Sequence, residues 1–295
     1  MSKYKSTVSV MFCALLTAGG MQLKDASAGS LNKTWEASGF KNPESVIYDA
    51  KRKVLYVSNV NGNPPEKDGN GFISRVSPDG KLLDPEWITG LDAPKGLAIY
   101  RDKLYVTDID TLVEIDLGKG VINKKYSAAK AKFLNDAAVD SKGRVYVSDM
   151  LDDAIYRLVD GKFELWLKDS KLESPNGLYV ERNRLVMGAW GVMTEGFSTQ
   201  VPGHLKTISL RDKKIESLGS GAPVGNLDGV ESDGHGAYFV SDWMAGKLFL
   251  IKPSGDAVEL LKLEQGSADL TYLKDKKLLI IPMMSGNRLI AYRVE

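Results

Sequence analysis

Short apolar strands recur along this chain, and six of them each follow a polar turn. The six units begin NPESVIYD, APKGLAIY, FLNDAAVD, SPNGLYV, NLDGVESD and SADLTYL, and corresponding positions lie 40 to 52 residues apart. Each unit continues with two more strands, which in the first unit read VLYVSN and GFISRVS. Runs of this length, rich in Val, Ile, Leu and Tyr, predict strands and not helices. Connections such as SPDG and SDGHG have the composition of tight turns.

This repeat predicts an all-β fold in which the units are the blades of a ring. Strands joined by short hairpins, with a period of about 40 to 50 residues, are typical of a β-propeller blade. Six units cover nearly the whole chain, so we expect a single six-bladed propeller domain over residues 29–295. The segment from Thr34 to Ala37 precedes the first unit. We expect it to close the ring as the outer strand of the sixth blade, because closure removes exposed sheet edges. A loose N-terminal tail is the alternative.

One position at the entry to each unit carries a polar or charged residue. The first strand of a blade lies innermost, so these side chains should point into the central channel at one end of the ring. Buried unpaired charge is unfavourable, and a divalent cation is the simplest neutraliser of the three carboxylates. Oxygen donors without thiol or imidazole favour Ca²⁺. A channel of polar side chains satisfied by water alone is the alternative. The six residues are Glu44, Lys95, Asn135, Asn176, Asp228 and Asp269.

Residues 1–28 differ in kind from the repeats. Two lysines precede an apolar stretch from Val8 to Leu16, and Ala26, Ser27 and Ala28 supply the small residues that signal peptidase requires. This pattern predicts a signal peptide cleaved after Ala28, and hence a periplasmic or secreted protein. The apolar stretch is too short to span a bilayer, so we expect no membrane anchor in the mature chain. The single cysteine, Cys13, lies within this segment, which leaves the mature chain without thiol chemistry.

Composition narrows the class of partner. The hydrophobic fraction of 43% supplies ample core material, and the formal net charge is +1. A near-neutral chain has no electrostatic bias toward nucleic acid or acidic membranes. We therefore expect neither of these partners. We expect instead a small-molecule substrate, and a monomer.

Four of the entry turns, taken together, resemble the SMP-30/gluconolactonase/LRE family of six-bladed propellers. They contain Glu44, Asn135-Asp136, Asn176-Gly177 and Asp228-Gly229, and the likeness extends over residues 36–295. The resemblance implies that Glu44, Asn176 and Asp228 bind a divalent metal. It implies that Asn135 lies beside the metal and contacts substrate, and in the related paraoxonase-type lactonases the matching residue is itself a ligand. Family members hydrolyse lactones, including sugar lactones, and some hydrolyse organophosphates.

The resemblance implies a metal-dependent lactonase that acts on a small lactone or ester, and the predicted signal peptide implies that it is exported. Asp228 is the first candidate for both metal ligand and catalytic base. Asp269 and Asp136 are the next candidates for the base. Lys95 is a candidate to hold an oxyanion or a substrate carboxylate, or else to form a salt bridge to Asp269 or Glu44. A noncatalytic propeller, which binds a ligand or a protein and holds a structural channel metal, is the alternative from a different class.

Two departures from the family pattern bear on the substrate. Sugar-lactone members have an arginine two residues before the asparagine that corresponds to Asn135. This chain has Phe133 at that position. An aromatic ring cannot donate hydrogen bonds to sugar hydroxyls, so Phe133 implies a less polar substrate. The histidine dyad of the paraoxonase-type enzymes also has no counterpart, since His204 and His235 lie in other contexts.

Further residues are expected around the same mouth. The inserts at residues 61–70 and 193–203 are candidate lids, because long loops in compact folds are often functional. If they cover the mouth, Phe197, Trp190 and Trp243 would form an apolar vestibule; packing between blades is the alternative. Because hairpins are antiparallel, the ends of the second strands should rim this mouth and hold either ligands or turns in place. These end residues are Asn59, Asp108, Asp149 and Asp242.

Overall fold

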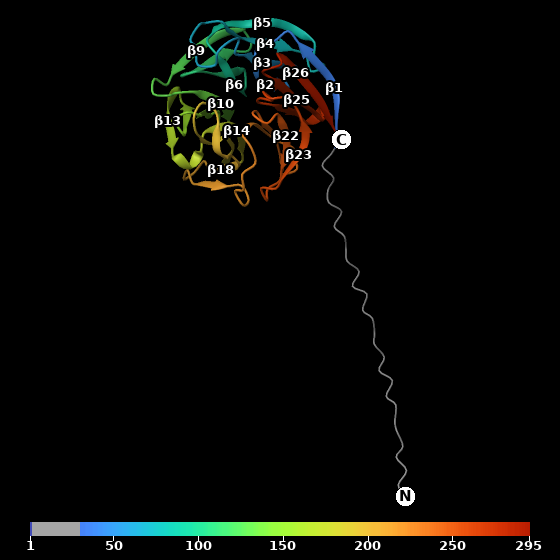
Figure 1. The fold of residues 1–295 in the computed structure, drawn as a ribbon. Coiled ribbons are helices and arrows are strands. Elements are labelled where there is room, and N and C mark those ends of the chain that lie inside the picture. The colour runs from blue at the N-terminus through green and yellow to red at the C-terminus, as the bar shows by residue number, and fades with distance from the viewer. Residues whose placement is uncertain (2–29) are drawn as a thin grey trace.

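In the computed structural model, which describes residue 1 and residues 30–295, six four-stranded antiparallel sheets surround a central axis (Figure 1). The predicted all-β, six-bladed propeller is confirmed. The predicted signal peptide lies outside the described residues. Helical structure in the described part is limited to two short 3₁₀ turns, Ser170–Leu172 and Lys274–Lys276. None of the helices in this part is long and apolar enough to cross a membrane.

Each blade is a meander whose strands run from the channel outward. The first blade comprises β2 (Pro43–Asp49), β3 (Val54–Asn59), β4 (Gly71–Val76) and β5 (Leu82–Leu91), and the second β6 (Pro94–Tyr100), β7 (Lys103–Asp108), β8 (Thr111–Asp116) and β9 (Val121–Ser127). The third comprises β10 (Leu134–Val139), β11 (Val145–Asp149), β12 (Ala154–Val159) and β13 (Lys162–Lys168).

The other three blades follow the same plan with two modifications. The fourth comprises β14 (Pro175–Glu181), β15 (Arg184–Ala189), β18 (Leu205–Ser209) and β19 (Ile215–Ser217), and a separate hairpin of β16 (Gly191–Met193) and β17 (Thr199–Pro202) is inserted in it. The fifth comprises β20 (Leu227–Ser232), β21 (Tyr238–Asp242), β22 (Lys247–Ile251) and β23 (Ala257–Lys262). The sixth comprises β24 (Thr271–Leu273), β25 (Leu278–Met283), β26 (Arg288–Val294) and β1 (Leu31–Ser38).

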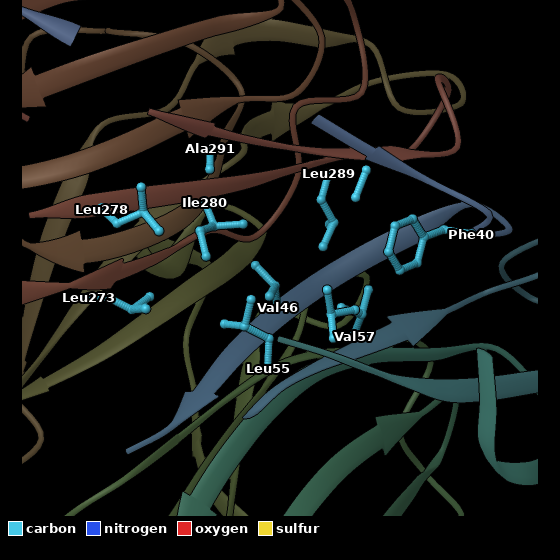
Figure 2. Packing of buried hydrophobic residues seen from close by; sticks show 11 residues of the cluster. Phe40, Val46, Leu55, Val57, Leu273, Leu278, Ile280, Leu289 and Ala291 are labelled. Carbon is cyan, nitrogen blue, oxygen red and sulfur yellow. The ribbon is translucent and has the colours of Figure 1, made fainter. Parts of the chain in front are cut away.

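The N-terminal strand closes the ring. β1 pairs antiparallel with β26, from Leu31 opposite Val294 to Ser38 opposite Arg288. This confirms the predicted closure, although the strand is longer than the segment expected from the sequence. Apolar side chains of the first and last blades also pack together at this joint (Figure 2). The labelled members of this cluster are Phe40, Val46, Leu55, Val57, Leu273, Leu278, Ile280, Leu289 and Ala291.

The outermost strands of the first five blades were not predicted from the sequence. β9, for example, reads VINKKYS, and five of its seven residues are exposed to solvent. Outer strands face solvent on one edge and need little apolar content, and lysines on such an edge oppose pairing with other chains. An apolar pattern therefore marks the three inner strands of a blade and not the fourth.

Candidate metal and substrate site

A β-bulge at the start of the innermost strand orients the candidate site residue in each of five blades. The register between the first and second strands shifts between Pro43 and Val46 in the first blade, and at the equivalent place in the next four. The site residue directly follows the first paired residue of the strand. A bulge bends a strand and redirects the side chain that it contains. The five residues placed in this way are Glu44, Lys95, Asn135, Asn176 and Asp228.

In the sixth blade the acidic residue lies one position later than the site residue of the other blades. Its first pair is the isolated bridge between Ser267 and Met283, so Ala268 takes the position of the site residue. Asp269 instead forms a parallel bridge with Ser45, the residue that follows Glu44, and its carboxylate accepts a hydrogen bond from the Ser45 hydroxyl. Because side chains alternate along a strand, a shift of one residue turns a side chain to the other side.

Asp269 accordingly lies in a different cavity from the other five. Those five line one pocket, whereas Asp269 lines a second cavity of about 150 Å³ together with Asp136 and Glu231. The Asp136 carboxylate accepts hydrogen bonds from the backbone N–H groups of Ala137 and Leu178, both at 2.6 Å. The expectation that all six residues converge on one site therefore holds for five. Glu231 was not among the candidates, and its position inside an apolar strand was the only sequence signal.

The pocket combines polar groups from the innermost strands with apolar groups from the loops. It has a volume of about 130 Å³. Its four oxygen-bearing residues are deeply buried, with exposed fractions of 6% for Glu44, 5% for Asn135, 1% for Asn176 and 4% for Asp228. The apolar side chains that line it include Phe133, Met150, Trp190, Phe197, Trp243 and Met284.

Two oxygen atoms in this pocket lack a hydrogen-bond donor. The Asn135 Nδ2 atom donates to Asn176 Oδ1 at 2.7 Å. Asn135 Oδ1 and Glu44 Oε2 are buried and have no hydrogen-bond partner. Unsatisfied buried acceptors are costly, and each one requires an explanation such as an ion. Two orphaned oxygens beside a second carboxylate, that of Asp228, fit a cation with a preference for oxygen ligands.

The candidate metal ligands are carboxylates and amides, without histidine or cysteine. Among residue 1 and residues 30–295, no group of three or more His, Cys, Asp or Glu side chains is arranged to hold a metal. The candidate set instead has two carboxylates, Glu44 and Asp228, and two amides, Asn135 and Asn176. With neither thiol nor imidazole on the pocket wall, this set suits a hard ion such as Ca²⁺.

The two carboxylates are held in an environment that disfavours their charge. Burial, followed by repulsion from Asp269 and Asp242, raises the pKa of Asp228 well above its ordinary value. Burial, followed by repulsion from Asp228 and Asp269, raises the pKa of Glu44 in the same direction, and the positive charge of Lys95 opposes this. A bound dication would remove the penalty by supplying the missing positive charge.

The ammonium group of Lys95 lies against backbone carbonyls and an aromatic ring. Its Nζ donates to Ala93 O at 2.9 Å and to Pro64 O at 3.2 Å, and lies 4.4 Å from the centre of the Phe133 ring. The lysine is 2% exposed, and burial lowers its pKa to about 8. In the described part of the chain Lys95 forms neither of the two salt bridges considered from the sequence.

Stability of the metal-free protein should fall as pH rises, because of the acids in the second cavity. Burial raises the pKa of Asp269 to about 7 and that of Glu231 to about 8. Between the ordinary acid range and these values the folded state binds more protons than the unfolded state, so the free energy of unfolding decreases with pH. Each group contributes at most about 1.4 kcal/mol per pH unit. Urea unfolding in chelator from pH 5 to 8 measures this slope.

The variant Glu231→Gln provides the control for this pH dependence. Since it removes one of the titrating groups, the slope should become shallower while the protein stays folded. A free energy of unfolding that increases from pH 5 to pH 8 would contradict the assignment.

The residues at the ends of the second strands hold turns in place. Asp108 accepts hydrogen bonds from the backbone N–H groups of Asp92 and Ala93, at the entry to the strand that carries Lys95. Asp149 does the same for Lys132 and Phe133 before β10. In the same way Asn59 Oδ1 accepts from the backbone N–H of Lys41, and Asp242 Oδ1 from that of Ala245. Of the two roles expected for these residues, the structure shows the turn-holding one.

Glycine follows the site residue where the innermost strands approach most closely. A Cβ atom on Gly177 would lie 1.9 Å from the carbonyl oxygen of Asp228. Equivalent atoms on Gly96 and Gly229 would also lie within 3 Å of backbone atoms of the next blade. Only glycine permits such contact. These residues therefore allow Asn176 and Asp228, which belong to neighbouring blades, to face one pocket.

Both inserts contribute to the mouth of the pocket. Pro64, from the insert at residues 61–70, lines it. The insert at residues 193–203 contains β17 and the turn of the β16–β17 hairpin, and it places Phe197 against the pocket. The Phe197 ring lies 6.1 Å from that of Phe133 and 6.2 Å from that of Trp190. The apolar vestibule expected from Phe197, Trp190 and Trp243 is thus present, and Pro64, Met150 and Met284 extend it.

The two histidines lie elsewhere. Neither lines the pocket. His204 Nε2 is 2.9 Å from the hydroxyl of Ser217 on an outer strand, and His235 lies in the turn before β21. This agrees with the expected lack of a histidine dyad.

Comparison with known proteins identifies one family and one fold. Residues 42–270 match the family described as the SMP-30/gluconolactonase/LRE-like region. Similar solved structures include a gluconolactonase from Xanthomonas campestris, which is 15% identical with a TM-score of 0.64 over 90% of this chain and 87% of that chain. A putative gluconolactonase is 17% identical with a TM-score of 0.66, over 91% of this chain and 93% of that one.

A solved structure that is not a gluconolactonase shares the same fold. Virginiamycin B lyase from Staphylococcus aureus is 13% identical, with a TM-score of 0.62 over 88% of this chain and 99% of that chain. At such identities these structures show a common fold and no more. A search of curated protein sequences found no match.

Proposed function

This chain belongs to the SMP-30/gluconolactonase/LRE-like family, and from this premise we propose that it is a metal-dependent lactonase acting on a small lactone or ester. One observation supports the proposal most directly. The buried, unpartnered oxygens of Glu44 and Asn135 lie in the same pocket as Asn176 and Asp228.

We propose that Glu44, Asn135, Asn176 and Asp228 hold Ca²⁺. The ion, when bound, supplies a Lewis acid that polarises a carbonyl group and lowers the pKa of water. The four residues come from four different blades, so the ring fixes their separations. Rigid support of this kind keeps a site ordered without reorganisation during the reaction.

We propose that Asp228 is the catalytic base. Its carboxylate lines the pocket beside the other candidate ligands, within reach of a water molecule or substrate bound there. The earlier expectation of a catalytic role for Asp269 becomes a positioning role, because Asp269 lines the other cavity. Its negative charge acts on Asp228 by raising the pKa of that residue.

The roles proposed for the remaining pocket residues follow from their contacts. Asn135 and Phe133 line the pocket beside the candidate ligands and would contact the substrate ring. The third N–H of Lys95, beyond the two that are bound to carbonyls, is available to an oxyanion.

A panel of lactones, each assayed with and without chelator, tests the proposed function. We expect hydrolysis of at least one small lactone, loss of activity on chelation, and recovery on addition of Ca²⁺. Calcium binding without turnover of any lactone or ester would overturn the proposal and favour a noncatalytic propeller with a structural ion. The proposed export is tested separately, since the mature protein should then begin at Gly29 by mass spectrometry.

A further inference from the structure

Most of the pocket wall is apolar, whereas the candidate metal ligands are polar. Seven of the twelve residues that line it are apolar. They include Phe133, Trp190, Phe197 and Trp243, so aromatic rings form much of the wall. Pockets are usually lined by apolar groups, with a small number of polar groups that orient the ligand. Here the apolar part is extensive enough to contact a substituent as well as the reacting ring.

The pocket is small. Its volume of about 130 Å³ is slightly less than that of an apolar cavity of about 150 Å³ that holds one benzene molecule. A single five- or six-membered lactone ring would therefore fill it. Any substituent on that ring must lie across the mouth, where the β16–β17 hairpin carries Phe197.

Several hydrogen-bond donors on the wall are already used within the protein. The indole N–H of Trp190 donates to the carbonyl oxygen of Phe197 at 2.9 Å. The amide of Asn135 donates to Asn176, and two of the three N–H groups of Lys95 are bound to backbone carbonyls. Because seven of the twelve lining residues are apolar, a hydroxylated ring would lose more hydrogen bonds to water here than the remaining donors, such as the third N–H of Lys95, could replace.

Phe197 is the exposed member of the aromatic wall. It is 44% exposed, whereas Phe133 and Trp190, which its ring contacts, are 5% and 4% exposed. Its ring therefore retains apolar surface that a bound substituent would cover. Removal of that surface from water favours binding.

We propose that Phe197 and the adjoining aromatic wall form a subsite for an uncharged apolar substituent, so that the preferred substrates are alkyl- or aryl-substituted lactones and not hydroxylated ones. This substrate class rests on the proposed lactonase function. Phe197 then determines specificity through binding and takes no part in the reaction.

The test compares three lactones that differ in the substituent. γ-Butyrolactone has none, γ-nonalactone has an alkyl chain, and glucono-δ-lactone has hydroxyl groups. We expect kcat/KM to be highest for the alkyl lactone, by about tenfold or more. The variant Phe197→Ala should raise KM for γ-nonalactone about tenfold and leave kcat nearly unchanged, with at most about a twofold change for γ-butyrolactone.

Leu165→Ala is the matched control. Leu165 is 50% exposed on the outer strand β13 and does not line the pocket. This variant should change none of the three rates. Equal losses on all three lactones in Phe197→Ala, or a preference of the wild type for the hydroxylated lactone, would overturn the proposal.

A binding measurement separates failure of the subsite from failure of the lactonase function. A 2-alkylcyclopentanone has the ring and chain but no scissile ester, and the fluorescence of Trp190 and Trp243 would report its binding. If no lactone is hydrolysed but the ketone binds and Phe197→Ala weakens it about tenfold, the function fails and the apolar subsite stands. If lactones are hydrolysed but the ketone binds equally to both proteins, the subsite fails and the function stands.

Discussion

The variant Asp228→Asn should abolish most lactone hydrolysis and at the same time stabilise the metal-free protein. The amide keeps an oxygen that can face a metal but cannot take a proton, and a positioned base contributes about 10²- to 10⁴-fold to rate. We expect kcat/KM to fall within that range. In chelator the variant should unfold at higher urea concentration than the wild type, because a buried carboxylate with a raised pKa is replaced by a neutral group.

Asp269→Asn is the matched control for that variant. It also replaces a buried acid with a raised pKa, but one that lies in the second cavity. Its kcat should stay within about tenfold of the wild type, since the group does not touch substrate. The acidic limb of the pH–rate profile should move to lower pH, because loss of this negative charge lowers the pKa of Asp228. Equal rate losses in both variants would contradict the distinct roles.

Calcium should stabilise the folded protein strongly. At a free concentration one hundred times its Kd, an ion that binds only the folded state adds about 2.7 kcal/mol to the free energy of unfolding. For a domain of this size such a gain raises the melting temperature by roughly 5 to 10 °C. The physical reason is the pair of unpartnered oxygens, on Glu44 and Asn135, that the ion would satisfy. Thermal unfolding in chelator and in calcium measures the shift.

Glu44→Gln tests whether the stabilisation comes from this pocket. It preserves the size of the side chain but removes one of two negative charges from the ligand set, so the calcium shift should fall to a small fraction of its wild-type value. Asp269→Asn, which leaves the pocket intact, should keep the full shift. An equal shift in Glu44→Gln would show that calcium binds elsewhere.

The sequence predicted the inner part of the ring well and its outer part poorly. Inner strands such as VLYVSN are buried on both faces, so burial itself produced the pattern that was recognised. The outer strand β13 reads KFELWLK and is largely exposed, and its place is set by pairing with β12 rather than by its own composition. Tertiary pairing decides such strands, and a single sequence carries little signal for it.

The candidate site shows a similar division. Glu44, Asn135, Asn176 and Asp228 follow one another at equivalent points of a repeat, and the symmetry of the ring brings them together. Asp269 was placed in the same series because its turn resembles theirs. The strand pairs of the sixth blade show instead that Ala268 corresponds to Asn135 and that Asp269 corresponds to Asp136, one residue beyond the site position.

Closure of the ring through β1 also governs the order in which the protein can be completed. The hydrogen-bonded side chains of Asn32 and Glu295 lie 263 residues apart. On the ribosome β1 emerges first and has no partner until β26 has been synthesised, so its edge stays unpaired throughout elongation. Contacts this distant in sequence also form slowly, because a long segment of chain must be confined first. The strand of the propeller that is synthesised last, β26, is therefore the one that completes the ring.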